Sequence, residues 1–361
     1  MSDTPSPAEP AGPAAVLVTG ATGLLGHAVV DRLLAAGSEV TALVRDRERA
    51  RALLPDHPGL RLVTGDITEP GSYRAALRGT DAVIHTAAYF REYYGPGHDL
   101  RRLYRTNVGA VEDLLRAAVD AGVPTVVHTS SIAVLGGGDT RAPADEDTPN
   151  GAPGRGNHYR ASKILAERVV SAFGERHGLR VPMVLPAWMW GPGDAGPTSA
   201  GRLFRAVAAG SVRALPAAGN HVVDARDVAD ACVAAAVRGA AGRRYIVGGR
   251  WHPLHEICAA VVRAAGTGTV PRRMPRGAAM PLAALLEWGA RARGREPVAT
   301  RTGMRALLDG HHRRVSSARA RRELGVAFRP LEETVTDQAG WHREHRRSPG
   351  AGPARRETRN A

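Results

Sequence analysis

A tyrosine and a lysine stand four residues apart in the run Tyr159-Arg160-Ala161-Ser162-Lys163. Residues i and i+4 share one face of a helix, so the phenol and the ammonium group can meet at one site. A free tyrosine has a pKa of about 10, and a neighbouring positive charge lowers that pKa by stabilising the phenolate. The pair therefore predicts proton exchange at a carbonyl or alcohol oxygen, with Tyr159 as the acid-base group and Lys163 lowering its pKa.

The use of lysine supports this prediction. The chain has 361 residues and 49 basic side chains, of which Lys163 is the one lysine. Arginine can replace lysine where only positive charge is needed, but its guanidinium is planar and does not give up its proton. Because the chain's one lysine lies four residues after Tyr159, a functional role of Lys163 is favoured. The alternative is an ordinary exposed pair whose lysine survived by chance.

Three glycines are spaced for dinucleotide binding in the run Val18–Gly26, which reads VTGATGLLG. Gly20 would permit a tight turn, Gly23 would let a pyrophosphate approach the backbone, and Gly26 would let a helix pack against a strand. The N–H groups at the start of that helix attract phosphate. The predicted phosphate-binding residues are Gly20, Thr22, Gly23, Leu24, Leu25 and Gly26.

The end of the next expected strand bears on the type of cofactor. NAD-preferring sites place an acidic residue there to accept hydrogen bonds from the ribose hydroxyls. Val44 occupies that place and Arg45 follows, and arginine suits a 2′-phosphate through charge-assisted bonds. NADP(H) is therefore the favoured cofactor. Asp46 is adjacent, so a shift of one residue would restore the acid, and NAD(H) stays open.

Two serines, Ser130 and Ser131, follow the expected strand Thr125–Thr129. Ligands of open α/β sheets bind beyond the carboxyl ends of the strands. A serine hydroxyl at this place can bind and polarise the oxygen of a substrate. Spacing alone does not choose between the two serines, and capping of the strand end is the structural alternative.

Aromatic side chains are scarce but concentrated, because five of the 16 aromatic residues lie between positions 89 and 104. Tyr89, Phe90, Trp188 and Trp190 all follow expected strands. We expect them to line the substrate pocket and to suit a flat or apolar carbonyl compound. The alternative is that they pack the interface between two lobes.

The elements that must position these residues alternate between strand and helix. Near-continuous apolar strands between helices predict a parallel sheet covered on both faces. Strands are expected over Ala14–Thr19, Glu39–Val44, Leu60–Val63, Asp81–His85, Thr125–Thr129 and Val181–Leu185, and an isolated strand is expected over Arg244–Val247 in the later part of the chain. Helices are expected over Leu24–Ala36, Leu103–Ala121, His158–Phe173 and Asp227–Val237.

The predicted fold class is α/β, a Rossmann doubly wound parallel sheet with a smaller C-terminal substrate lobe. Glycine and proline become dense after Pro186, which marks the change of pattern. We expect a disordered leader over 1–13 and a dinucleotide-binding domain over 14–186, whose sheet edge is completed by later segments. A substrate lobe over 187–345 and a disordered basic tail over 346–361 complete the organisation.

Composition excludes several classes of protein. A hydrophobic share of 43% and a charged share of 23% exclude wholesale disorder. Cys232 and Cys258 alone cannot form a disulfide framework or a zinc site, so no metal is expected and a cytoplasmic location is favoured. No uncharged apolar run approaches the roughly 18 residues of a membrane-spanning helix, and the N-terminus lacks the pattern of a signal peptide.

The net charge of +14 is concentrated near the C-terminus. Residues 261–361 carry 21 basic and 9 acidic side chains, against 28 and 26 in residues 1–260. Such a region can bind nucleic acid or an anionic membrane. Because no aromatic side chains interleave with the arginines as stacking platforms, we expect a solvated basic surface with no nucleic-acid or membrane partner.

Together the motifs resemble the extended short-chain dehydrogenase/reductase family from about Ala14 to Gly340. The glycine run is similar to its TGxxGxxG form, and the segment Asp81–Ala88 is similar to its DxxxHxAA form. The resemblance implies a triad of Ser131, Tyr159 and Lys163, with Lys163 also binding the nicotinamide ribose. It implies further cofactor contacts or supports at Asp66, Ile67, Thr86, Ala87, Ala88, Asn107 and Pro186.

Within that family the chain is most similar to dihydroflavonol-reductase-like members, which implies NADPH-dependent reduction of a ketone or aldehyde, or the reverse oxidation of an alcohol. A nucleotide-sugar epimerase or dehydratase with tightly bound NAD uses the same triad and is the alternative. A non-catalytic NADP-sensing regulator is a third hypothesis, disfavoured by the intact Tyr159 and Lys163. The resemblance also implies a homodimer, formed through the helices expected over Leu103–Ala121 and His158–Phe173.

Overall fold

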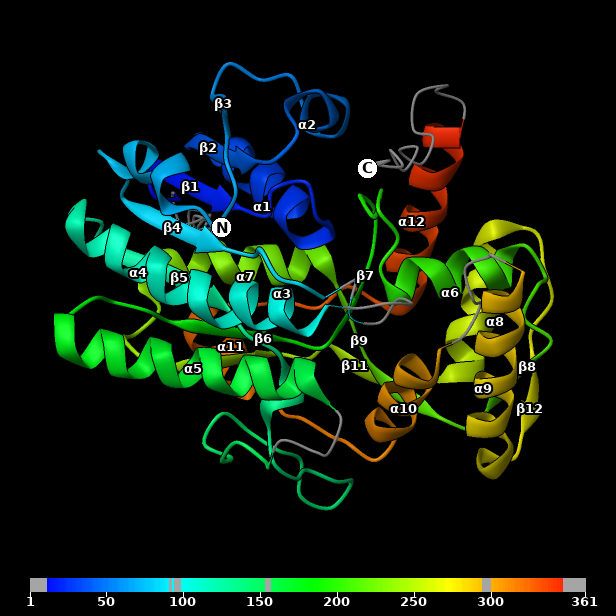
Figure 1. The fold of residues 1–361 in the computed structure, drawn as a ribbon. Coiled ribbons are helices and arrows are strands. Elements are labelled where there is room, and N and C mark those ends of the chain that lie inside the picture. Colours follow the sequence, from blue (N-terminus) through cyan, green and yellow to red (C-terminus); the bar gives the residue numbers. More distant parts are fainter. Residues whose placement is uncertain (1–11, 91–92, 94–98, 153–156, 294–299, 347–361) are drawn as a thin grey trace, which may run out of the picture.

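The computed structural model describes residues 12–90, 93, 99–152, 157–293 and 300–346 (Figure 1). The expected disordered leader and basic tail lie outside the described residues, apart from positions 12, 13 and 346.

Seven strands form one sheet in the order β10-β6-β5-β4-β1-β2-β3. All neighbours pair in parallel. The chain builds outward from β1 to β3 and then crosses to β4 on the other side of β1, which confirms the predicted doubly wound sheet. The strands are β1 (Ala15–Thr19), β2 (Glu39–Val44), β3 (Leu60–Thr64), β4 (Ala82–His85), β5 (Thr125–Thr129), β6 (Met183–Pro186) and β10 (Arg244–Val247).

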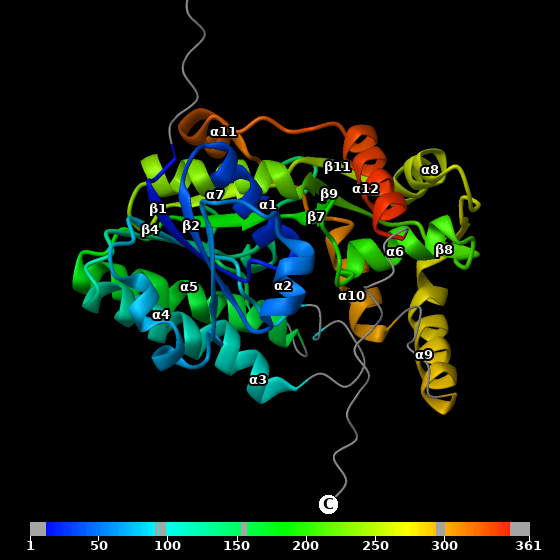
Figure 2. The same ribbon diagram turned by 90° about the horizontal axis from the view of Figure 1, so that it is seen from above.

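Helices cover both faces of this sheet because its strands are apolar on both sides. Figure 2 shows α1, α7 and α11 on one face and α3, α4 and α5 on the other. Two buried apolar clusters fill the two layers between helices and sheet. The helices are α1 (Leu24–Ala35), α2 (Arg47–Leu53), α3 (Leu100–Tyr104), α4 (Ala110–Asp120), α5 (His158–His177), α7 (Ala225–Arg238) and α11 (Ala318–Leu324).

The later part of the chain forms a lobe beside the carboxyl ends of the strands and also returns to the main sheet through β10, α7 and α11 (Figure 1). A three-stranded sheet in the order β11-β9-β7 and a two-stranded pair β12-β8 lie in this lobe. The strands are β7 (Trp188–Trp190), β8 (Ala214–Pro216), β9 (Gly219–Asp224), β11 (Arg250–Pro253) and β12 (Arg272–Met274). The helices are α6 (Ser199–Ala208), α8 (Leu254–Ala265), α9 (Arg276–Ala292), α10 (Arg301–Gly310) and α12 (Leu331–Arg346).

The helix expected over Leu103–Ala121 differs from the prediction. It begins as α3, where the side chain of Asp99 caps the first turn, and passes through a π-helical segment, η3 (Arg105–Gly109), into α4. Apolar spacing cannot reveal one inserted residue in a helix, because the buried face simply continues after it. Such π segments are frequent at functional sites.

Short 3₁₀ segments complete the fold. They are η1 (Pro70–Ser72), η2 (Arg74–Leu77) and η4 (Ile132–Val134). Among the helices in the described part of the chain, none is both long and apolar enough to cross a membrane.

Candidate active site

The glycine run forms the turn between β1 and α1. Gly20 has a φ of 72°, and a Cβ atom there would lie 2.7 Å from the backbone nitrogen of Ala87. A Cβ atom on Gly26 would overlap the carbonyl oxygen of Gly20, so the first turn of α1 lies directly against the loop. Both glycines are therefore required by close backbone approach, as the spacing predicted.

The first turn of α1 can hold phosphate groups. Its cap residue, Gly23, is extended and exposed and makes no side-chain capping bond. The first bond within the helix runs from His27 to Gly23, so the N–H groups of Leu24, Leu25 and Gly26 have no partner within the helix. Thr22 lies half-buried beside them. This cradle without side chains fits a dinucleotide pyrophosphate.

The end of β4 lies against the same loop. The hydroxyl of Thr86 donates to the carbonyl of Thr19 at 2.7 Å, and the backbone of Ala87 reaches the hydroxyl of Thr19 at 3.4 Å. Thr86, Ala87 and Ala88 are half-buried at this edge of the sheet. The predicted cofactor segment and the glycine loop are thus adjacent.

The ends of β2 and β3 carry the residues expected near the adenosine. Arg45 follows the last residue of β2 and is exposed, whereas Asp46 accepts a hydrogen bond from the backbone of Arg49 at 2.9 Å and caps α2. Burial would raise the pKa of Asp66, but hydrogen bonds from Thr68 and the positive charge of Arg45 hold that pKa below its usual value. The side chain of Ile67 belongs to the apolar core, so any contact of this residue with a ligand would come from its backbone.

The three predicted catalytic residues meet beyond the end of β5. Ser131 follows the strand and caps η4, while Tyr159 and Lys163 lie one turn apart on α5. Burial raises the pKa of Tyr159 above its ordinary value, and a hydrogen bond with the Ser131 side chain opposes this rise. The phenol therefore stays protonated at neutral pH.

Lys163 is buried and contacts the last residue of β5. Its amine donates to the backbone carbonyl of Thr129 at 2.8 Å, and the opposing influence on the phenol comes from Ser131. Burial lowers the pKa of Lys163 to about 8, with the charge of Glu167 acting in the opposite direction. The expectation that Lys163 lowers the pKa of Tyr159 stays a prediction.

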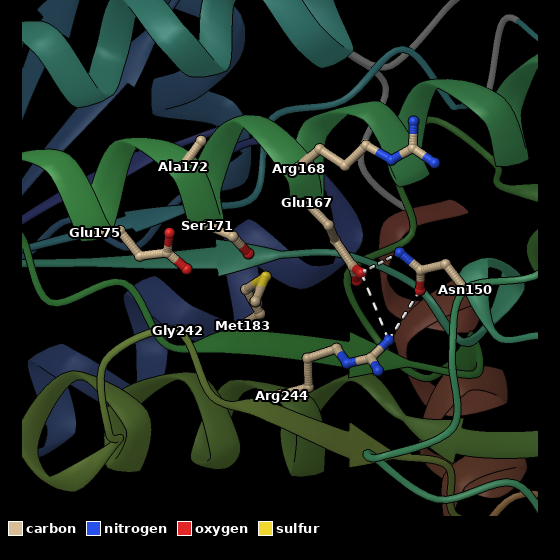
Figure 3. A pocket seen from close by; sticks show the side chains of 9 residues that line it. All are labelled: Asn150, Glu167, Arg168, Ser171, Ala172, Glu175, Met183, Gly242 and Arg244. Atoms are coloured by element: carbon tan, nitrogen blue, oxygen red, sulfur yellow. Dashed lines mark hydrogen bonds and ion pairs between the residues drawn. The ribbon is translucent and has the colours of Figure 1, made fainter.

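Glu167 continues the face of α5 that carries Tyr159 and Lys163, and the sequence analysis missed it. Its buried carboxylate accepts from the Ser130 hydroxyl at 2.5 Å and from the Asn150 amide at 3.1 Å. The guanidinium of Arg244 on β10 lies 3.7 Å from the Glu167 carboxylate, and Figure 3 shows the side chains of Asn150, Glu167 and Arg244 pointing toward one another. The spacing of four residues after Lys163 was the available signal.

Two histidines lie buried beneath the lysine. His85 of β4 and His128 of β5 stack with ring centroids 5.7 Å apart. Burial and the charge of Lys163 lower the pKa of His85 to about 3 and that of His128 well below its usual value. Thr19 binds the Nδ1 atom of His85 at 2.8 Å. Both rings are therefore neutral at physiological pH.

Asn107 lies in the π-helical segment and joins three parts of the site. Its amide oxygen accepts from the backbone of Tyr89 at 2.7 Å, and its amide nitrogen donates to the Ser162 hydroxyl at 3.1 Å. The residue is buried, so it ties the segment after β4 to α5 from within. This is a supporting position, as the family resemblance implied.

Aromatic side chains surround the phenol of Tyr159. The rings of Phe90 and Tyr159 meet edge to face with centroids 5.1 Å apart, and those of Tyr93 and Tyr159 stack at 6.2 Å. Tyr89 is buried in the same cluster, and its hydroxyl accepts from the backbone of Asp99 at 2.9 Å. Phe90 and Tyr89 thus lie close to Tyr159. Tyr89, however, packs inside the aromatic cluster and does not line an open pocket.

The two tryptophans of β7 lie apart from this cluster. Trp190 is fully buried in the core of the lobe, so its predicted place in the pocket wall is wrong and the packing alternative holds. Trp188 is half-buried and donates to the Ser199 hydroxyl at 3.1 Å. Pro186 ends β6, and the loop that follows β7 approaches α1, because a Cβ atom on Gly193 would overlap the ring of His27.

Two hollows in the described surface lie elsewhere. A cavity of about 480 Å³ lies between α5 and β10 and contains Glu167 and Arg244 (Figure 3). A second cavity of about 220 Å³ lies in the lobe, next to Trp251 and Arg273. None of the residues predicted to line a substrate pocket lines either one.

Comparison with known proteins decides the family. The family described as "NAD dependent epimerase/dehydratase family" matches residues 16–248, which include the glycine loop and all three catalytic candidates. The chain belongs to this family. The resemblance to extended short-chain dehydrogenases/reductases is thereby confirmed.

Proteins with different names are similar to this chain. Sterol demethylase protein B of Methylococcus capsulatus is 33% identical over 91% of this chain and 98% of its own length. A 3β-hydroxysteroid dehydrogenase/Δ5→4-isomerase of Mycobacterium tuberculosis is 38% identical over 55% of this chain. The match spans 53% of that relative's length.

A solved structure has a similar fold. DesIV, a dTDP-glucose 4,6-dehydratase of Streptomyces venezuelae whose structure contains NAD, aligns with a TM-score of 0.74 and 25% identity. The alignment covers 92% of this chain and 98% of DesIV. A protein named as a steroid dehydrogenase and one named as a sugar-nucleotide dehydratase are thus both similar to this chain.

Proposed function

We propose that the protein is an NADP(H)-dependent oxidoreductase that interconverts a ketone or aldehyde and the corresponding alcohol. The observation that carries the proposal is the placement of Ser131 directly after β5 together with Tyr159 and Lys163, which lie one turn apart on α5. The glycine loop and the end of β4 provide a dinucleotide cradle at the same edge of the sheet.

The chain's own residues can perform the proton chemistry. The hydroxyls of Ser131 and Tyr159 would bind the carbonyl oxygen of the substrate, and Tyr159 would give it a proton. The phenol is protonated at neutral pH, as the proton donor of a reduction must be. A bound nicotinamide would supply the hydride for the carbonyl carbon, so that hydride and proton together yield the alcohol. Lys163 would orient the nicotinamide ribose, as the family resemblance implies.

Two features support NADP(H) over NAD(H). Arg45 is exposed directly after β2, where its guanidinium can bind a 2′-phosphate. Asp46, the acid that left NAD(H) open, is engaged in capping α2. A nicotinamide dinucleotide is the broader expectation for this family, and DesIV contains NAD.

The proposed substrate is an apolar carbonyl compound. Phe90 and Tyr93 pack around Tyr159, so the surroundings of the phenol are aromatic. Two similar proteins carry names that refer to sterols or steroids. Both observations favour a flat, apolar ring system over a charged sugar nucleotide.

A sugar-nucleotide epimerase or dehydratase is the second candidate, and it is favoured by the likeness to DesIV over nearly the whole chain. Such an enzyme would recycle a tightly held NAD⁺, so the net reaction would not be a reduction. Retention of the nucleotide through purification therefore distinguishes the two candidates.

The test is to purify the full chain, identify any nucleotide released from it, and titrate the emptied protein with NADPH and NADH by nicotinamide fluorescence. We expect little retained nucleotide and at least about tenfold tighter binding of NADPH, because a charge-assisted contact to a phosphate discriminates strongly. Arg45→Ala should remove most of this preference. Arg51→Ala, at an exposed arginine of α2 paired with Glu48, is the control and should retain it.

Stoichiometric NAD⁺ in the purified protein and no preference for NADPH would contradict the proposal. That result would favour the epimerase or dehydratase. A clear NADPH preference that survives in Arg45→Ala would contradict only the assignment of Arg45.

A further inference from the structure

Exposed apolar side chains gather in one segment of the lobe. Six large apolar side chains are exposed among the described residues, and four of them lie between positions 270 and 288. This segment contains β12 and α9, and Figure 2 shows α9 protruding from the lobe. Single exposed apolar residues are common, but a cluster of them marks an interaction site.

The two faces of α9 differ sharply. Its inner face carries Ala279 and Ala283, which pack in a small buried cluster with Met304 of α10. Pro281, Leu285 and Trp288 are spaced at i, i+4 and i+7, so they form a stripe on the opposite face. The side chain of Leu285 is 62% exposed and that of Trp288 is 70% exposed.

The charges around this stripe have one sign. Among residues 266–293 the one acid is Glu287, which is buried on the inner side and accepts from the backbone of Arg301 at 3.0 Å. The exposed charged side chains described in this segment are Arg272, Arg273, Arg276 and Arg293. Arg273 and Arg276 contact groups of the lobe, His255 at 2.7 Å and the carbonyl of Ala217 at 2.8 Å, so the arginines flank the apolar stripe and do not lie on it.

We propose that this outer face of α9, defined by Pro281, Leu285 and Trp288 with the flanking arginines, docks on the surface of an anionic phospholipid membrane. Tryptophan and leucine can enter the region between headgroups and acyl chains, while arginine binds the lipid phosphates. A second copy of the chain fits less well, because two such faces would bring like charges together.

The proposed helix lies on the membrane and does not cross it. This inference goes beyond the proposed reaction and does not depend on it. It also departs from the expectation, drawn from the sequence, that the protein has no membrane partner.

The test uses the full chain and vesicles of phosphatidylcholine with or without phosphatidylglycerol. We expect the protein to sediment with the anionic vesicles, and its binding to weaken as salt is raised. Trp288 is the one tryptophan of the five with an exposed side chain. Its entry into the lipid should shift the fluorescence emission of the protein to shorter wavelength.

A matched pair of variants tests the site. Trp288→Glu should lower the vesicle partition coefficient at least about tenfold, because it places a negative charge in the apolar stripe. Val237→Glu is the control, since Val237 is also exposed, at 43%, but lies on α7. It should bind vesicles like the unchanged protein.

Three results would overturn the inference. The first is no sedimentation with anionic vesicles under low salt. The second is equal loss of binding in Trp288→Glu and Val237→Glu, which would indicate nonspecific attraction. The third is a stable dimer in sedimentation equilibrium that Trp288→Glu dissociates, because the stripe would then be covered by a second copy.

Discussion

The side-chain amine of Lys163 on α5 donates a hydrogen bond of 2.8 Å to the backbone carbonyl of Thr129, the last residue of β5. This bond joins the helix that carries Tyr159 to the strand end that leads to Ser131. An ammonium group on a flexible stem can reach this buried carbonyl, whereas a planar guanidinium has a different shape and stays charged. The position therefore gives a structural reason for the chain's one lysine.

Lys163→Met should stabilise the folded protein near pH 7 while it abolishes activity. The folded pKa of Lys163 is about 8, below its unfolded value of 10.5. The penalty for burying the charge is thus fully present below pH 8 and disappears as pH rises toward 10.5. The variant also loses the hydrogen bond to Thr129, so we expect its unfolding free energy at pH 7 to exceed that of the unchanged protein by about 2 kcal/mol. Urea unfolding at pH 7 and pH 10 checks this, and a variant that is less stable at both values would contradict it.

Glu167→Gln should shift the pH dependence of turnover. The charge of Glu167 supports the protonated form of Lys163 against burial, so its removal should lower the pKa of Lys163 further. We expect the alkaline limb of the kcat profile to move down by about one pH unit. His85 and His128 also face Lys163 but are neutral in this range, and Tyr159 stays protonated.

Glu175→Gln is the matched control, because Glu175 is exposed two turns further along α5 and lines the same cavity (Figure 3). Its profile should not move. A uniform loss of kcat in Glu167→Gln with an unchanged profile would show that Glu167 only supports the local structure through Ser130 and Asn150.

His128→Phe should make the folded protein less sensitive to acid. The pKa of His128 is well below 6.5 in the folded chain, so the unfolded chain binds an extra proton as pH falls below 6.5. The unfolding free energy therefore falls as the pH is lowered, and His128 contributes up to about 1.4 kcal/mol per pH unit to this fall. The variant should flatten the slope of unfolding free energy against pH by that amount between pH 6 and 5. An unchanged slope would contradict the buried, neutral state of this ring.

Gly26→Ala should damage both the fold and dinucleotide binding. Its Cβ atom would overlap the carbonyl oxygen of Gly20, so α1 would have to move away from the loop. We expect a loss of about 1–3 kcal/mol in unfolding free energy, together with weaker binding of NADPH. Gly71→Ala has open space around the new methyl group and serves as the control for stability. Normal NADPH affinity in Gly26→Ala would contradict the proposed cradle.

The strands of the main sheet could be predicted closely, because apolar runs bounded by glycine identify buried parallel strands. The strand expected over Glu39–Val44 has the same bounds in the structure. Helix ends were less certain. The helix expected to end at Phe173 continues to His177, where Gly178 adopts a φ of 65° and ends it.

The candidate site was predictable where motifs are local, and not where it depends on packing. The glycine loop and the Tyr159–Lys163 pair could be recognised from spacing alone. The contact of Glu167 with Ser130 and the stack of His85 on His128 join residues that are far apart in the sequence. Trp190 shows the same limit, since only the fold places it in the core of the lobe.

The most direct test of the proposed oxidoreductase measures NADPH oxidation by the full chain with a panel of apolar ketones, including steroid ketones, and compares it with Tyr159→Phe. We expect turnover with at least one ketone, and a loss of about 10²–10⁴-fold in kcat for the variant, because it lacks the proton donor. The Kd for NADPH should stay within about twofold, since the hydroxyl serves the substrate oxygen. Near-normal turnover by Tyr159→Phe would contradict the central role given to this phenol.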